Sequence, residues 1–303
     1  MMRTITVTNF LNQSLELDIR RPDKTGLTVI NPSGLGPGEA NILMTELVTQ
    51  DGAIYDMARK SYRTIEMTIK NGRTGELTEE DTRHRIYKYF PLKRPLTLRF
   101  QTDRRDVSIE GLVERNEAVI FSNQVHSNLS IVCPDPWFYD RRTQITEFLG
   151  VEPLFEFPFS NESLTENLLE MGRIFEDEAR TIYYEGDVEV GVVIYLYAEG
   201  PIVQFRILDE LTGGSMSIND ARLAAITGSG IIRYDKIVID TRRGKQSIRL
   251  YRDNQSYNII NALNRDATQF RLRKGDNVFR YTAYSGIENA IFRIENQIAF
   301  EGL

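Results

Sequence analysis

The composition, the alternation of apolar and polar residues and the scarcity of helical segments all predict a mainly β protein. The chain of 303 residues contains 30 Ile, 16 Val and 23 Thr against 26 Leu and 14 Ala, with 15 Phe and 14 Tyr in addition. β-Branched and aromatic side chains pack well on a pleated, half-buried surface. The hydrophobic fraction of 41% is enough for ordinary cores and too high for a disordered chain.

Short segments with period-two alternation recur along the chain. In residues 15–20 the apolar side chains fall on one face of an expected strand and the charged ones on the other. The same alternation is found at 65–69, 96–100, 129–133, 203–207, 237–239 and 290–294. One wet and one dry face is typical of antiparallel sheets in sandwiches. The continuous apolar run 190–197 indicates a central strand that is covered on both sides.

Few segments have a residue pattern that predicts a helix. The clearest begins at Thr78, where Asp81 completes a capping box, and ends before Pro91. Residues 165–172 form a weaker candidate. Residues 219–226 contain a capping residue and three alanines but are short, so their structure is left open.

The charge distribution predicts where the chain divides. A length of 303 residues favours two domains. Residues 1–140 carry a net charge of −1, residues 141–187 carry −7, and residues 188–303 carry +2. Pro134 and Pro136 disfavour continuation of the preceding strand. We therefore expect a first domain over 1–140, an acidic connecting segment over 141–187 and a second β domain over 188–303.

The overall composition argues against several classes of protein. The 37 basic and 43 acidic residues give a net charge of −6, which disfavours a protein whose main task is to wrap nucleic acid. No stretch approaches 20 consecutive apolar residues, so no membrane-spanning helix is expected. The first residues lack the apolar block of a secretory signal. Cys133 is the single cysteine, which excludes a disulfide within one chain.

Metal and cysteine chemistry find little support in the sequence. His84 and His126 are the two histidines, and a four-ligand zinc site would need both of them together with Cys133 and a carboxylate. His126 and Cys133 are seven residues apart, so on one strand they point to opposite faces, which also weakens a Cys–His dyad. We interpret Cys133 as a core residue.

The remaining candidates for chemistry are a glycine loop and clusters of carboxylates. Gly228-Ser229-Gly230 lacks the third glycine of a dinucleotide fingerprint and is interpreted as a turn. Residues 176–178 form the densest acidic cluster, and Asp135 and Asp140 flank the aromatic run 137–139, which could stack a sugar or a base. Solvated charge and aromatic packing at the joint are the simpler interpretations. The sequence therefore predicts no catalytic, cofactor-binding or metal-binding residues, no cofactor and no enzymatic activity.

The order of several segments resembles the distal tail proteins of bacteriophages with long, non-contractile tails. The matching segments are 63–69, 83–90, 95–100, 111–114, 121–122, 133–138, 155–158, 184–187, 235–241, 270–277 and 302–303.

The resemblance implies a structural component of the virion at the tail tip of a phage or prophage, assembled in the bacterial host cytoplasm. The first domain would be a ring-forming β-sandwich or split barrel with one helix, and the second a galectin-like, jelly-roll β-sandwich. Such proteins form a homohexameric ring that joins the tail tube protein to the tail-tip protein and serves as a hub for receptor-binding proteins.

A ring of this kind would let DNA and the tape-measure protein pass through its lumen. The net charge of −1 over residues 1–140 leads us to expect a lumen that is not strongly basic. From the charge balance and the lack of a long apolar stretch, we expect no specific binding of nucleic acid and no membrane contact. Two alternatives remain: a carbohydrate-binding adhesion module for host cell-wall sugars, and a tail-associated hydrolase.

Overall fold

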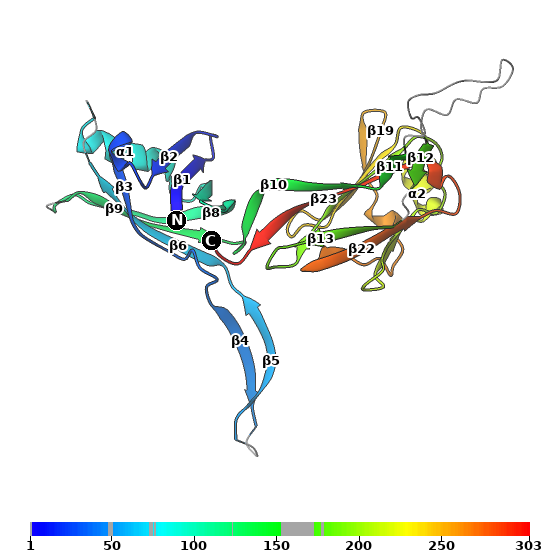
Figure 1. Cartoon of the computed structure of the whole chain (residues 1–303), viewed down its shortest axis with the longest axis horizontal. Coiled ribbons are helices and arrows are strands. Elements are labelled where there is room, and N and C mark those ends of the chain that lie inside the picture. The colour runs from blue at the N-terminus through cyan, green and yellow to red at the C-terminus, as the bar shows by residue number, and fades with distance from the viewer. Residues whose placement is uncertain are drawn as a thin grey trace, which may run out of the picture. The chain divides into compact units, whose positions relative to one another are not determined.

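The computed structural model describes residues 2–47, 51–72, 75, 77–122, 124–152, 173–176 and 179–303. They form two compact units (Figure 1). Unit 1 comprises Met1–Arg141 together with Ala299–Leu303, and unit 2 comprises Arg142–Ile298. Strands predominate in both, which confirms the predicted mainly β fold class.

The predicted domain limits stay a prediction. Residues 153–172 and 177–178 of the expected acidic segment 141–187 lie outside the described residues, and so does the helix candidate 165–172. The ends of that segment that are described include strands: β10 (Phe138–Glu147) begins in unit 1 and continues into unit 2, and β13 (Ala179–Tyr184) belongs to unit 2.

Unit 1 is built from antiparallel strands around the long strand β8 (Asp106–Val119). The strands that form the body of this unit with it are β1 (Met2–Asn9), β2 (Ser14–Asp18), β3 (Leu27–Ser33), β6 (Arg63–Asn71), β7 (Pro95–Thr102) and β9 (His126–Cys133). The first half of β8 pairs with β7, which leads to β1 and β2, and its second half pairs with β9, which leads to β6 and β3. One strand therefore contributes to two sheets, and their apolar faces form the core.

Gly111 allows β8 to approach β9 closely near the point where β8 changes partner. A Cβ atom at this position would lie 2.7 Å from Cγ2 of Ile131 and 3.0 Å from Sγ of Cys133. The register with β9 shifts between Val113 and Arg115, which marks a bulge.

The helix of unit 1 follows the predicted pattern. Helix α1 spans Glu79–Tyr89, and Thr78 is its N-cap. The backbone N–H of Asp81 donates to Thr78 Oγ1, and that of Thr78 donates to the Asp81 carboxylate at 2.9 Å, so the capping box is formed. Phe90 ends the helix immediately before Pro91. The predicted helix is confirmed.

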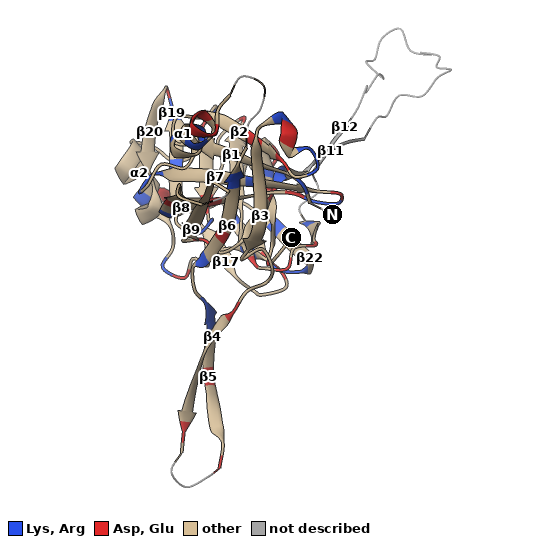
Figure 2. Ribbon diagram, turned by 90° about the vertical axis from the view of Figure 1, so that its left-hand side faces the viewer, with Lys and Arg blue, Asp and Glu red and all other residues tan. Residues whose placement is uncertain are grey.

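A two-stranded hairpin projects from the body of unit 1 (Figures 1 and 2). Its strands, β4 (Ala40–Glu46) and β5 (Ala53–Lys60), pair with each other and with no other described strand. Every residue of β4 and all but the last of β5 are exposed. We call residues 40–60 the arm.

Unit 2 consists of two main sheets. The strands of this unit are β11 (Leu149–Glu152), β12 (Arg173–Glu176), β13, β14 (Val190–Gly191), β15 (Val193–Ala198), β16 (Arg206–Asp209), β17 (Ser215–Ser217), β18 (Lys236–Asp240), β19 (Ser247–Arg252), β20 (Gln255–Asn258), β21 (Arg271–Leu272), β22 (Gly275–Thr282) and β23 (Ala290–Phe300). One sheet contains β23, β15, β18, β19 and β20 in that order, and the other contains β13, β22, β16 and β17.

Four aromatic side chains form the centre of the core of unit 2. Tyr281 of the second sheet stacks on Phe292 of the first with ring centroids 5.1 Å apart, and Phe148 and Phe205 pack against both. All four are buried. Aromatic pairs from both sheets thus join the two layers.

Two segments of unit 2 refine the sequence expectations. The apolar run 190–197 forms β14 and β15, and β15 lies between β18 and β23. The expected cover on both sides is incomplete, because Tyr195 and Tyr197 on one face of β15 are only half-buried. The segment left open at 219–226 forms helix α2 (Asp220–Thr227), with Asn219 as N-cap and Gly228 in the left-handed conformation at its end. Among the described residues, no helix is long and apolar enough to cross a membrane.

Candidate functional site

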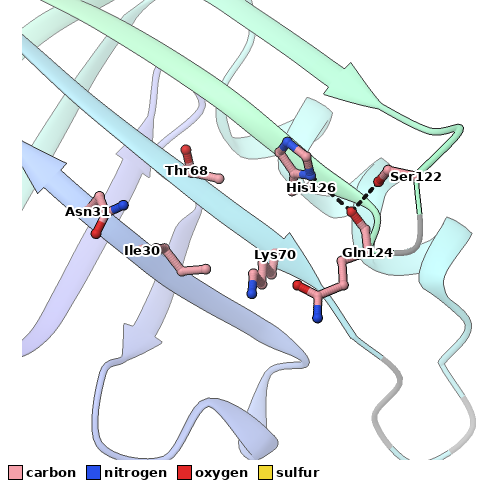
Figure 3. Close-up of a pocket in the computed structure, with 7 residues that line it drawn as sticks. All are labelled: Ile30, Asn31, Thr68, Lys70, Ser122, Gln124 and His126. Carbon is pink, nitrogen blue, oxygen red and sulfur yellow. Dashed lines mark hydrogen bonds between the residues drawn. The ribbon is translucent and has the colours of Figure 1, made fainter.

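His126 and Cys133 lie at opposite ends of β9 in different environments. His126 is half-buried and lines an open, polar recess with Thr68, Lys70 and Gln124, and its Nδ1 is 2.9 Å from the Gln124 carbonyl oxygen (Figure 3). Cys133 is fully buried, and burial raises the pKa of its thiol to about 12, although Arg63 acts in the opposite direction. A thiol with so high a pKa is not an active nucleophile.

His84, the other histidine, also does not belong to a group of potential metal ligands among the described residues. His84 lies on α1 with its side chain largely exposed, 3.8 Å from Glu80 Oε1 and stacked near Tyr87. Within the described residues, no three His, Cys, Asp or Glu side chains come together as metal ligands would.

The glycine loop after α2 is held by a buried ion pair. Arg252 contacts the Asp235 carboxylate through Nε and Nη2, and the same guanidinium donates to Ser229 Oγ and to the carbonyl oxygen of Gly230, each at 2.7 Å. The Asp235 side chain is 1% exposed and that of Arg252 10%. The loop is therefore a structural turn fixed by an internal arginine.

The acidic and aromatic cluster near residue 137 is engaged within unit 1. The Asp135 carboxylate accepts a hydrogen bond from the Tyr139 hydroxyl at 2.7 Å. Lys60, at the base of the arm, places Nζ 4.5 Å from the centre of the Trp137 ring. Phe138 is fully buried. Of the cluster at 176–178, residues 177–178 lie outside the described residues.

Arg63 is the most densely bonded side chain of this region, and no sequence pattern identified it. It is 5% exposed, and it donates to the backbone carbonyls of Pro136, Gly34, Gly36 and Glu301. Its guanidinium also lies 4.6 Å from the centre of the Phe138 ring. The four carbonyls join three remote segments of unit 1, so this arginine holds the unit together and is not poised to bind a ligand.

The outer face of the first sheet of unit 2 carries an aromatic and basic cluster. Tyr195 and Tyr197 project from β15 with nearly parallel rings, centroids 6.3 Å apart, while Ile194 and Leu196 between and beside them are buried. Lys236 Nζ lies 5.3 Å from both ring centres, and the Arg293 guanidinium lies 4.7 Å from that of Tyr195. The protein's own cations therefore pack against these rings.

Among the described candidate groups, Cys133 is buried, Asp135 accepts a hydrogen bond from Tyr139, and the glycine loop is held by Arg252. The unusual features of the molecule are surfaces: the exposed arm of unit 1 and the tyrosine face of unit 2. Both are suited to binding other molecules, and neither brings together a nucleophile, a base and a substrate cavity.

The whole chain has the fold of a hub protein from the adsorption apparatus of phage tails. The solved structure of the SPP1 Dit protein, described as a paradigm of the hub adsorption apparatus in phages that infect Gram-positive bacteria, matches 98% of this chain and 99% of its own with a TM-score of 0.65 and 12% identity. A chain of the phage P2 baseplate, in its activated conformation with Ca, matches 98% of each chain with a TM-score of 0.51 and 13% identity.

No family model matches the chain, and no curated protein does so by sequence. At 12–13% identity these likenesses establish the fold. The resemblance to distal tail proteins predicted from the sequence is confirmed at that level.

Proposed function

We propose that this chain is a non-catalytic hub of a phage or prophage tail, at the junction of the tail tube and the tail tip. One observation carries the proposal: a single solved hub protein matches both units in one continuous comparison, with nearly complete coverage of both chains. A shared sandwich alone would match one unit, whereas the same two units in the same order indicate a shared architecture.

The proposed mechanism is geometric. Six copies form a ring whose lumen continues the tail tube, so that DNA and the tape-measure protein pass through it. The ring binds the tube protein on one side and the tail-tip protein on the other, and it carries receptor-binding proteins. The net charge of −1 over residues 1–140 supports a lumen without strong basic character, since tight phosphate contacts would hold the exiting DNA.

The absence of an enzymatic role is part of the proposal. Its support comes from the contacts of the candidate groups: Cys133 is buried with a raised thiol pKa, Asp235 is engaged by Arg252, and Asp135 accepts from Tyr139. A hydrolase would instead require an accessible pair of carboxylates across a substrate cleft.

Immunogold labelling of assembled tails tests the proposed location. Antibodies raised against the full chain are applied to purified particles from the phage or from the induced prophage. We expect gold at the tip end of the tail in most labelled particles, and tails that lack a tip when the gene is deleted. Labelling along the tube or at the capsid, or normal tails after deletion, would contradict the proposal.

The tyrosine face of unit 2 favours a second candidate, binding of cell-wall carbohydrate. Two neighbouring rings beside charged side chains resemble a surface on which a sugar could stack. Because Lys236 and Arg293 already pack against the rings, we rank this candidate second. A glycan array with the full chain tests it: retained signal in Tyr195→Ala and Tyr197→Ala variants, or no signal in the wild type, would reject it.

A further inference from the structure

The open recess beside His126 has the size and the lining of a small polar site. Its other lining residues are Ile30, Asn31, Thr68, Lys70, Ser122 and Gln124 (Figure 3). The volume of about 450 Å³ falls within the range of about 300–1,000 Å³ that is usual for small-molecule sites. All but one of these side chains are polar or charged, so a polar ligand fits the recess better than an apolar one.

Three adjacent strands form the floor of the recess. Ile30 of β3 pairs with Thr68 of β6, and Lys70 of β6 pairs with His126 of β9. Thr68 Oγ1 donates to Asn128 Oδ1 at 2.9 Å, which joins β6 to β9 a second time. Residues directly opposite each other on paired strands share a face of the sheet. The side chains of Lys70 and His126 therefore project from the same face, the one that does not pack into the core.

A register shift in β3 forms one edge of the recess. The pairing of β3 with β6 shifts between Ile30 and Ser33, and Asn31, which lies between them, has a φ of +47°. Asparagine is one of the few residues other than glycine that enters this left-handed region readily. Irregularities of this kind re-aim a side chain and are over-represented next to functional sites. The amide of Asn31 is thereby placed in the lining of the recess.

The recess offers positive charge and no counter-charge. Its lining contains no Asp or Glu. Lys70 and His126 stand directly opposite each other, a position in which two like charges destabilise a sheet. Lys70 is half-buried, and in the described part of the chain it forms no ion pair. A half-buried ammonium loses part of its hydration, and an anion in the recess would compensate this loss.

Carboxylates on the same sheet face lie outside the recess. Glu117 of β8 is opposite Asn128, and Glu66 of β6 is opposite Ser130. Glu66 is also 3.7 Å from the Arg115 guanidinium. A long polyanion along this face would be repelled by these carboxylates, whereas a single small anion in the recess would not contact them.

The hydrogen-bonding groups of the recess fit a phosphate. A carbonyl oxygen only accepts, so His126 donates from Nδ1 to the Gln124 carbonyl at 2.9 Å, and Nε2 is the ring nitrogen that faces a ligand. Nε2 accepts from a P–OH group when the ring is neutral and donates to a phosphate oxygen when it is charged. The Lys70 ammonium and the side-chain amides of Asn31 and Gln124 are further donors around the same opening (Figure 3).

We propose that this recess binds a phosphate group, either as inorganic phosphate or as a phosphate monoester. A monoester carries a charge of about −1.5 to −2 near neutral pH and presents three acceptor oxygens, which match the cations and the amides of the lining. A carboxylate carries one charge on a planar group and would leave part of these donors unused. Duplex DNA is disfavoured, because its backbone requires several clustered cations. The inference goes beyond the proposed hub function and does not depend on it.

Phosphorus NMR of the ligand tests the binding at any assembly size of the protein. The full chain is titrated with inorganic phosphate at constant pH and ionic strength, and the width of the phosphate signal is measured. We expect saturable broadening with a Kd of about 1 mM. Glycerol 3-phosphate should displace phosphate with a Kd within about threefold of this value, and acetate should require at least about a tenfold higher concentration. Absence of saturable broadening, equal displacement by acetate, or stronger displacement by duplex DNA would overturn the inference.

Substitutions in the recess test the location of the bound phosphate. Lys70→Gln should raise the Kd at least about tenfold, and His126→Gln and Asn31→Gly should raise it about threefold each. Glycine suits the positive φ at position 31, so Asn31→Gly removes the amide and keeps the backbone. The matched control is Lys93→Gln, at an exposed lysine of unit 1 outside the recess, with a Kd within about twofold of the wild type.

The variants are compared only where circular dichroism shows the wild-type fold. If Lys70→Gln does not fold, His126→Gln and Asn31→Gly carry the test. Equal Kd values for the recess variants and for Lys93→Gln would show that phosphate binds elsewhere or only through the general charge of the protein, and would overturn the assignment of the recess.

Discussion

Arg63 donates a hydrogen bond from Nη2 to the backbone carbonyl of Glu301 at 2.5 Å, across 238 positions of the chain. The same side chain binds the carbonyls of Gly34, Gly36 and Pro136. Burial lowers the pKa of this guanidinium, while Glu301 acts in the opposite direction. The end of the chain is thereby tied to the first strands of unit 1.

Replacement of Arg63 should loosen the C-terminal segment. Arg63→Met leaves four carbonyls without their donor, and we expect a loss of about 3 kcal/mol in the free energy of unfolding of unit 1. Hydrogen exchange should show lost protection at the Leu303 amide, which donates to the Leu35 carbonyl. The control is Arg115→Met, at a half-exposed arginine, with an expected change below about 1 kcal/mol. Equal effects of the two variants would contradict this role.

Loss of the ion pair between Asp235 and Arg252 should strongly lower the stability of unit 2. Asp235→Asn leaves a buried guanidinium without its counter-charge, which costs about 3–5 kcal/mol. The comparison is Asp106→Asn, where Arg99 and Asp106 are about one third exposed and the expected loss is below about 1 kcal/mol. Urea unfolding measures both. A loss below about 1 kcal/mol in Asp235→Asn would show that the loop at 228–230 is held by other contacts.

Cys133 should be unreactive in the native state. Burial raises the pKa of its thiol from 9.0 to about 12. The thiol pKa is higher in the folded than in the unfolded protein, so the buried, protonated thiol contributes to the free energy of unfolding below pH 9. This contribution is lost as the pH rises toward 12. We expect Ellman's reagent at pH 8 to react about 100-fold more slowly with native protein than with protein in urea.

The matched variant for this prediction is Cys133→Ala. Its stability should fall less than that of the wild type between pH 9 and pH 12, since the buried thiol no longer ionises. Rapid labelling of the native wild type, or parallel pH profiles for the two proteins, would refute the assignment of Cys133 as a buried core thiol.

Gly111 should be required for the close packing of β8 against β9. In Gly111→Ala the new methyl group meets Ile131 Cγ2 at 2.7 Å and Cys133 Sγ at 3.0 Å, so the strands must separate, at a cost of about 1–3 kcal/mol. At Gly36 a Cβ atom has nothing within 4 Å, and Gly36→Ala should be close to neutral. Thermal unfolding of the two variants measures the difference. A Gly111→Ala variant as stable as the wild type would contradict the requirement for glycine at this position.

Local signals made part of the fold predictable from the sequence. Helix α1 was specified by residues within one turn, since Thr78 and Asp81 form the capping box by themselves. The strands with one dry face, such as β9, were visible through period-two alternation. Helix α2 stayed open because it spans eight residues and has one buried apolar side chain, so its pattern carries little information.

Several other features of the structure had no local signal. The arm is apolar on exposed strands with a register shift between Leu43 and Met44, so it shows no alternation. Arg63 binds backbone carbonyls, which every residue provides, and no sequence pattern marks them as its partners. The tyrosine face was not predicted, because the apolar run at 190–197 indicated a strand covered on both sides. Its cations come from β18 and β23, which are remote in sequence.

The central claim is that this chain holds other tail proteins in register at the tip. Cryo-electron microscopy of assembled tails, with the structure fitted into the density, is the most direct test. Our account predicts a ring of copies between the last tube ring and the tip protein. Density for the chain at any other position, or a tip junction made without it, would contradict the account.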